Sequence, residues 1–159
     1  MKIKFKEEQR FRQWWLWTFI ILFVVGIAAM ILYQNFTGKE IGDNSISKLE
    51  FIKLSMGVLI TVILLWTIKL KTEIDQKGIR FSFFPFSSKN ILWEEIKKAE
   101  VLEYGFVGFG IRLWTKHGTV YNIKGNNGLA IELSNGKKIL IGTQQKEELI
   151  ELLKKTNLP

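Results

Sequence analysis

The sequence predicts a two-helix membrane hairpin followed by a compact β-rich domain that ends in one helix. Two long apolar runs lie in the first seventy residues, a period-two alternation of apolar residues begins after them, and an amphipathic stretch closes the chain. The 159 residues leave room for one domain of ordinary size. The chain has no cysteine, which excludes disulfides and thiolate metal sites, and its single histidine, His117, argues against a histidine-based metal site.

The first apolar run, residues 14–33, contains no charged residue, and eleven of its twenty residues are Leu, Ile, Val or Phe. A helix of this length spans about 30 Å, which is the thickness of the hydrocarbon core of a bilayer. A cleaved signal peptide is the alternative, but its apolar region usually has only about 7–15 residues. We therefore predict that residues 14–33 form a transmembrane helix.

The second apolar run, residues 54–68, is shorter and spans about 22 Å as a helix. Adding Phe51 and Ile52 extends it to about 27 Å, provided that Lys53 directs its ammonium group to the interface. The interior of both runs contains no Asp, Glu, His or Arg, which are the residues that mark transport or proton relay inside a membrane. We therefore expect the two helices to act as an anchor.

The charges around the two runs predict the orientation of the chain. Five Lys or Arg against two Glu precede the first run, Lys69 and Lys71 follow the second, and residues 34–53 carry three of each sign. The positive-inside rule then predicts that both termini lie in the cytoplasm. The predicted parts are a basic cytoplasmic N-terminus over residues 1–13, transmembrane helices over 14–33 and 51–69, a short extracytoplasmic loop over 34–50 and a cytoplasmic domain over 70–159.

Alternating apolar residues after Lys71 predict seven strands joined by short turns. Pro85 ends the second strand because it has no N–H to donate. Asn135-Gly136 is the strongest hairpin signal and implies two residues tolerant of positive φ. A helix follows, with Thr143 as its N-cap. The predicted strands cover residues 72–76, 79–84, 98–104, 109–115, 119–124, 128–134 and 137–142.

Seven antiparallel strands followed by one amphipathic helix resemble a pleckstrin-homology (PH) domain. The hairpin and the domain together look like small bacterial membrane proteins that carry a PH-like domain, and the resemblance covers residues 71–157. It implies a bent antiparallel β-barrel or sandwich whose open end is plugged by the C-terminal helix. The resemblance rests on Gly110-Ile111-Arg112, Tyr121-Asn122-Ile123-Lys124-Gly125, Gly128 and Ile139-Leu140-Ile141-Gly142-Thr143.

Two groups of residues are candidate lipid or partner contacts. Lys71, Lys77 and Arg80 lie around the first hairpin, where phosphoinositide-binding PH domains carry a basic motif. The short turn and the absence of a Lys/Arg-x-Arg ending argue against specific inositide recognition and favour general attraction to anionic headgroups. Phe106 and Phe109 lie in a glycine-rich loop, where they are candidates for contact with lipid or a partner.

The sequence also limits the class of function. No nucleophile and base can be paired, so we expect neither an enzyme nor a cofactor or metal site. Basic residues of the domain alternate with acidic ones, which argues against nucleic-acid binding. We expect a membrane-tethered module that docks a partner protein or organises an oligomer. The alternative is a domain that senses lipid headgroups through basic and aromatic residues.

Overall fold

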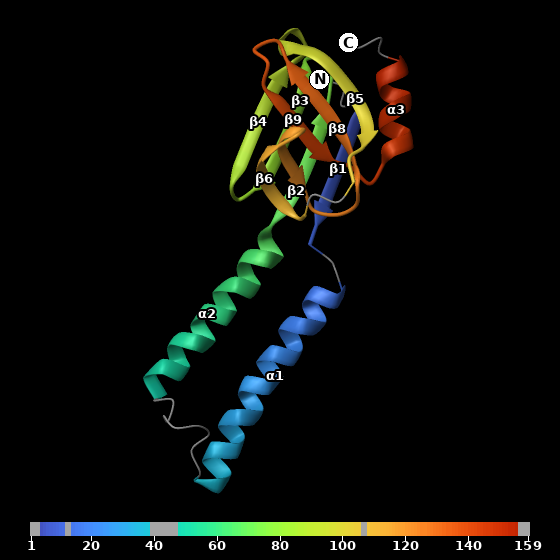
Figure 1. Cartoon of the computed structure of the whole chain (residues 1–159). Helices are drawn as coiled ribbons and strands as arrows, with labels where there is room; N and C mark the ends of the chain where they lie inside the picture. Colours follow the sequence, from blue (N-terminus) through green and yellow to red (C-terminus); the bar gives the residue numbers. More distant parts are fainter. Residues whose placement is uncertain (1–3, 12–13, 39–47, 106–107, 156–159) are drawn as a thin grey trace. The chain divides into compact units, whose positions relative to one another are not determined.

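The computed structural model describes residues 4–11, 14–38, 48–105 and 108–155 (Figure 1). The chain forms two compact units. One is drawn from both ends of the chain, residues 1–11 and 68–159, and the other consists of residues 12–67 between them. We call them the β unit and the helical unit.

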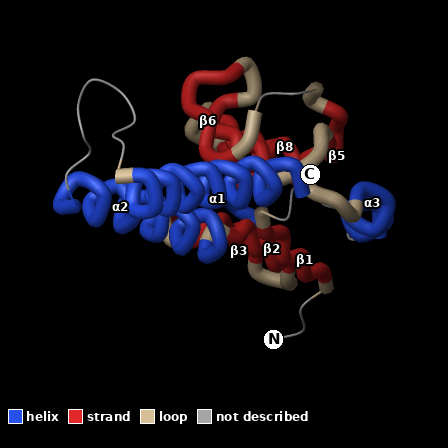
Figure 2. The backbone as a smooth tube through the Cα atoms, turned by 90° about the horizontal axis from the view of Figure 1, so that it is seen from below, coloured by secondary structure: helices blue, strands red, loops and turns tan. Residues whose placement is uncertain are grey.

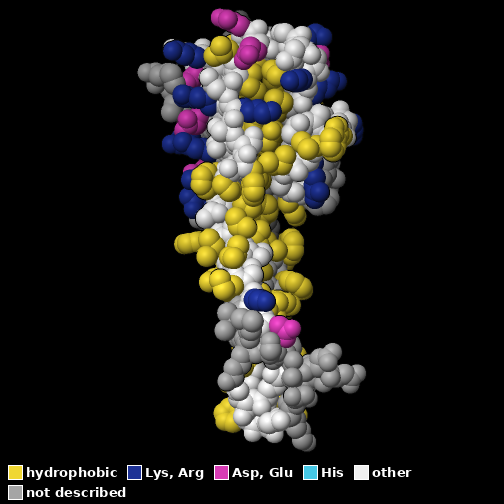
Figure 3. Space-filling model, turned by 90° about the vertical axis from the view of Figure 1, so that its left-hand side faces the viewer, with side chains coloured by type: hydrophobic (Ala, Val, Ile, Leu, Met, Phe, Trp, Pro, Cys, Tyr) yellow, Lys and Arg dark blue, Asp and Glu magenta, His cyan; other side chains and the backbone are white. Residues whose placement is uncertain are grey.

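The helical unit contains α1 (Trp14–Thr37) and α2 (Lys48–Thr67), which lie beside each other (Figures 1 and 2). With 24 residues and a mean hydropathy of 2.6, α1 is the one described helix long and apolar enough to cross a membrane, and every residue in it is at least partly exposed. The apolar part of α2, Lys53–Thr67, is shorter. Figure 3 shows many hydrophobic side chains on the surface of this unit.

The β unit consists of two sheets and a C-terminal helix. The first sheet has the strand order β1-β2-β3-β4, and the second has the order β5-β8-β9-β7-β6. A short 3-10 helix, η1 (Trp93–Glu95), joins the sheets, and α3 (Lys146–Lys155) closes the unit. The strands are β1 (Phe5–Arg10), β2 (Lys69–Ile74), β3 (Gly78–Phe84), β4 (Ser87–Leu92), β5 (Ile96–Glu103), β6 (Gly110–Thr115), β7 (Gly118–Asn122), β8 (Asn127–Leu133) and β9 (Lys138–Gly142).

Strand β1 precedes the helical unit, yet it pairs with β2, which follows that unit. The two strands are antiparallel along their whole length, from Phe5 opposite Ile74 to Arg10 opposite Lys69 (Figure 2). Buried and exposed residues alternate strictly along β1, as expected for an edge strand with one face on the core. Residues 5–10, which the sequence predicts to belong to a basic N-terminal segment, form part of the folded β unit.

The expected seven antiparallel strands are not what the structure contains. The described residues form nine strands, of which β1 and the polar edge strand β4 were not predicted. In addition, β9 runs parallel to β7. Strand β9 lies between β8 and β7, and Ile139, Leu140 and Ile141 are all buried. A central strand that is buried on both faces has a continuous apolar sequence. The sequence of β9 therefore does not show that this strand pairs with β7 as well as with β8.

The two sheets share one core. Phe81 of the first sheet contacts Tyr121 of the second edge to face, with ring centroids 4.8 Å apart. Leu149 of α3 is buried in the same cluster, so the expectation that the C-terminal helix packs on the sheets is confirmed. The Thr143 hydroxyl accepts a hydrogen bond from the Gln145 N–H at 3.1 Å, in a turn ahead of α3. Because Thr143 lies three residues before the first residue of α3, it is not the N-cap of that helix.

The hairpin between β8 and β9 is confirmed, but its turn differs from the expected one. Gly136 has a φ of 79°, whereas Asn135 is not left-handed. The Gly136 N–H donates to Leu133 O at 2.9 Å, and the Asn135 side chain accepts the Lys137 N–H at 3.0 Å. This geometry fits a type I turn followed by a left-handed glycine, in which one residue alone requires positive φ.

Two left-handed glycines provide a matched test of the β7–β9 contact. A Cβ at Gly118, where φ is 76°, would overlap the carbonyl oxygen of Lys138, whereas a Cβ at Gly136 meets no atom within 4 Å. We expect Gly118→Ala to lower the free energy of unfolding by about 3 kcal/mol, and Gly136→Ala by about 1 kcal/mol, since the second change carries only the penalty of positive φ. Thermal melting of the full chain in detergent, followed by circular dichroism, measures both, and equal losses would contradict the close approach.

Candidate binding groove

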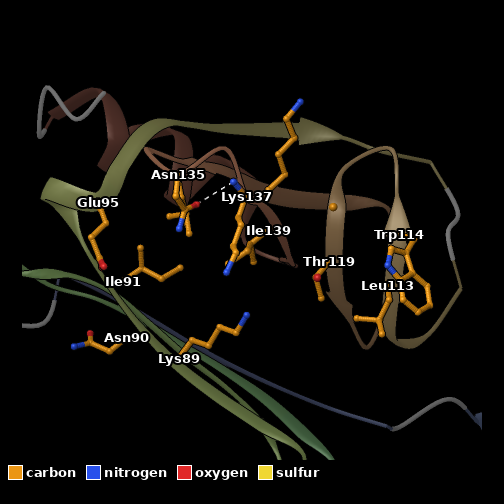
Figure 4. Close-up of a pocket in the computed structure, with 13 residues that line it drawn as sticks. Lys89, Asn90, Ile91, Glu95, Leu113, Trp114, Thr119, Asn135, Lys137 and Ile139 are labelled. Atoms are coloured by element: carbon orange, nitrogen blue, oxygen red, sulfur yellow. Dashed lines mark hydrogen bonds between the residues drawn. The ribbon is translucent and has the colours of Figure 1, made fainter.

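A groove of about 560 Å³ opens between the sheets of the β unit. Strand β4 forms one wall, and the β6–β7 and β8–β9 hairpins form the other (Figure 4). Lys89 reaches from β4 into the groove, Glu95 and Asn135 lie at one end, and Leu113 and Trp114 lie at the other. The groove is therefore open, mixed in polarity and flanked by an edge strand.

The charge of the groove is basic. Lys89, Lys137 and Lys138 line it, and Glu95 is the one acidic residue among the described residues of its lining. The Lys89 ammonium lies 5.8 Å from the centroid of the Tyr121 ring. This cation–π contact orients the Lys89 side chain into the groove. The Glu95 carboxylate accepts the Leu92 N–H at 2.9 Å and is engaged locally. An acidic ligand would therefore complement this surface.

Trp114 is the most unusual residue of the groove. Its side chain is 95% exposed, and its φ of 54° lies in the left-handed region, where a non-glycine residue is strained. The register of β6 against β7 shifts between Arg112 and Thr115, so Trp114 lies in a bulge that turns its side chain outward. Leu113 beside it is 53% exposed. Strain combined with exposure of a large ring favours a role in contact with a ligand.

Two strand edges are available next to this groove. Strand β4 is last in the order of the first sheet, and β6 is last in the second. An edge strand presents N–H and C=O groups that an added strand can pair with. Most of β4 is exposed, and Ile91 is its one buried residue. The groove can thus receive an extended peptide along β4.

The predicted basic site is largely neutralised and lies elsewhere. The Lys71 ammonium lies 2.9 Å from the Glu73 carboxylate, and Arg80 Nη2 lies 3.0 Å from Asp75 Oδ2. The hydrogen bond from Lys71, with the charges of nearby basic residues, lowers the pKa of Glu73. Lys77 is exposed in the turn after β2. These three basic residues share one hairpin, but two of them are paired with acids.

Of the two aromatic residues predicted to contact lipid or a partner, the structure describes Phe109. The Phe109 ring lies 6.4 Å from the Phe11 ring, edge to face. Phe106 lies outside the described residues. Of the four candidate contacts among the described residues, Lys71, Lys77 and Arg80 share one hairpin, and Phe109 contacts the residue that follows β1. Lys89 and Trp114 of the groove were not predicted from the sequence, although two adjacent large apolar residues, Leu113-Trp114, break the alternation of β6.

A buried polar cluster holds β1 against the second sheet. The Glu7 carboxylate accepts the Thr143 hydroxyl at 2.6 Å, the Gln144 N–H at 2.7 Å and Gln9 Nε2 at 3.0 Å. The same Gln9 nitrogen donates to Gly142 O at 2.7 Å. These bonds satisfy a charge that burial would otherwise penalise, so the cluster has a structural role.

A second partly buried pair lies beside β7. Burial raises the pKa of Tyr104 to about 12, and its ring lies 6.3 Å from the His117 ring, edge to face. Burial, followed by the charges of Lys116 and Lys138, lowers the pKa of His117. Both groups are therefore held neutral at physiological pH, and among the described residues no three His, Cys, Asp or Glu side chains converge as metal ligands would.

Comparison of the chain with protein-family models, with curated proteins and with solved structures found no match.

Proposed function

We propose that the chain is a non-enzymatic, membrane-tethered binding module. Two membrane-crossing helices hold the β unit at the cytoplasmic face of the membrane, and the groove beside β4 docks a partner protein. The pairing of β1 with β2 carries this proposal, because it joins the two ends of the helical unit in one sheet.

The pairing requires an even number of membrane crossings. If α1 crosses the bilayer, the chain must return before β2 in order to meet β1. The 20 residues of α2 span about 30 Å, and its apolar part, Lys53–Thr67, spans about 22 Å, so the return requires local thinning of the bilayer or flanking side chains that extend to the interface. Cleavage after α1 would remove β1 together with the buried Glu7 cluster, which argues against a signal peptide. The basic residues on both outer flanks of the helices favour the cytoplasm for the β unit.

The groove supports docking of an extended acidic segment. Three lysines offer complementary charge, the edge of β4 offers backbone partners, and Trp114 offers an aromatic anchor. Headgroup sensing through Lys71 and Arg80 has less support, because acidic neighbours already engage both side chains. The relationship to PH domains stays a prediction, and the parallel β7–β9 pair departs from the antiparallel order that the resemblance implies.

Single-cysteine labelling tests the anchor, since the chain has no cysteine of its own. We expect Ser45→Cys, between the helices, to react in intact cells with a membrane-impermeant maleimide. Lys77→Cys, in the exposed turn after β2, should react only after the membrane is permeabilised. Labelling of both sites, or of neither, in intact cells would contradict the two-crossing topology.

A further inference from the structure

The turn between β3 and β4 carries two exposed aromatic side chains that the groove does not use. Phe84 is 47% exposed and Phe86 is 61% exposed, and Pro85 lies between them. The Phe86 N–H donates to Phe83 O at 2.9 Å, so the turn is closed by the backbone. Exposed aromatic residues at a turn indicate contact with an apolar or interfacial environment.

The strand register places this turn at the end of the first sheet that is joined to the helices. Phe84 is opposite Lys69, the first residue of β2, and Lys69 is opposite Arg10, the last residue of β1. Only Ile68 separates Lys69 from Thr67, where α2 ends.

Chain connectivity limits how far the turn can lie from α2. Consecutive Cα atoms are about 3.8 Å apart, and paired residues of antiparallel strands are about 4.5–5.5 Å apart. The Cα of Phe84 therefore lies within about 13 Å of the Cα of Thr67, whichever way the β unit turns about Ile68. Headgroups add about 5–8 Å to each side of the hydrocarbon core, so phenylalanine side chains on this turn can reach that layer.

The chemistry near the turn matches an interface. The Lys69 ammonium lies 5.7 Å from the centroid of the Phe84 ring, which combines a cation with an aromatic face. Trp66, near the end of α2, is 72% exposed, in the position of an interfacial aromatic belt. The turn at the other end of β2, Asp75-Gln76-Lys77, is polar and lies about 17 Å further along the strand.

We infer that Phe84 and Phe86 insert into the headgroup layer of the membrane that α2 crosses, and so hold the β unit at a defined orientation to the bilayer. The inference rests on the proposed two-crossing anchor. It assigns the membrane contact to the β3–β4 turn and not to Lys77, Arg80 or the glycine-rich loop.

Spin labels on single cysteines test the inference in the full chain, reconstituted into vesicles of phosphatidylcholine and phosphatidylglycerol. The sites are Phe86→Cys, Leu92→Cys and Val24→Cys. Leu92 is the matched control, since it is 41% exposed and lies at the opposite end of β4. Val24, within α1, reports on the anchor. Frequent collision of a spin label with oxygen indicates that the label lies in lipid, and frequent collision with a soluble nickel chelate indicates that it lies in water.

We expect oxygen collisions to dominate at positions 24 and 86, and nickel collisions to dominate at position 92. Nickel dominance at position 86 with oxygen dominance at 24 would overturn the inference and leave the anchor intact. Nickel dominance at 24 would overturn the anchor, and the inference with it. Oxygen dominance at all three positions would overturn the specific role of the β3–β4 turn.

Discussion

Replacement of Glu7 by alanine is expected to lower the free energy of unfolding of the β unit by about 3–5 kcal/mol. The buried carboxylate accepts hydrogen bonds from Thr143, Gln144 and Gln9. Its removal takes the acceptor from the buried Thr143 hydroxyl and from one N–H of the buried Gln9 side chain, and each unpaired buried group costs roughly 1–3 kcal/mol. The loss is large compared with the usual effect of one substitution.

Glu8→Ala is the matched control for this change. Glu8 is the next residue of β1, but its side chain points outward and pairs with Arg10 at the surface. A surface pair of this kind contributes roughly 0–1 kcal/mol. Chemical denaturation of the full chain in detergent, followed by near-ultraviolet circular dichroism, compares the two variants. Equal and small effects would show that β1 is not held by the Glu7 cluster.

Substitution of Trp114 by glycine is expected to separate stability from binding. The left-handed conformation costs a non-glycine residue about 1–2 kcal/mol, and glycine adopts it freely. The exposed ring contributes little to the core, so the variant should be as stable as the original chain or slightly more stable. Docking should weaken by about 30-fold or more if the ring is a central anchor of the interface, where truncation typically costs 2 kcal/mol or more.

A synthetic peptide of alternating glutamate and valine is the probe for this experiment. Fluorescence anisotropy follows its binding to the full chain in neutral detergent. Lys89→Glu combined with Lys137→Glu should abolish binding, because both residues line the groove. Lys97→Glu combined with Lys98→Glu carries the same change of charge on β5, outside the groove, and should leave most binding intact. Equal losses in both double variants, or full binding by the glycine variant, would contradict docking in the groove.

Local signals in the sequence were enough to predict several elements. An uninterrupted apolar run predicted α1, which extends four residues beyond the expected end at Tyr33. The Asn135-Gly136 pair predicted the β8–β9 hairpin, and the amphipathic stretch at the end of the chain predicted α3. In each case the residues that determine the element are neighbours in the chain.

Other elements depend on partners that are distant in the chain. Strand β1 is short, and its outward positions carry Lys6, Glu8 and Arg10, so composition favoured a basic tail. The whole helical unit separates β1 from β2, and no local pattern reports that pairing. Trp114 was missed for a different reason, because its left-handed φ belongs to a bulge in the pairing of β6 with β7, and the expected regular strand contained no bulge. The groove was missed because its two walls belong to different sheets, and local patterns do not show how the two sheets pack.

The pairing of β1 with β2 makes the helical unit an insertion within a β-hairpin. During synthesis β1 leaves the ribosome first, but its partner strand emerges only after both helices. If both helices cross the membrane as proposed, the first sheet is complete only once the chain has returned to the side on which β1 lies. On that topology, a chain whose second helix failed to cross would leave β1 and β2 on opposite faces, and the first sheet would lack β1. Completion of the first sheet would then depend on correct insertion of the helices.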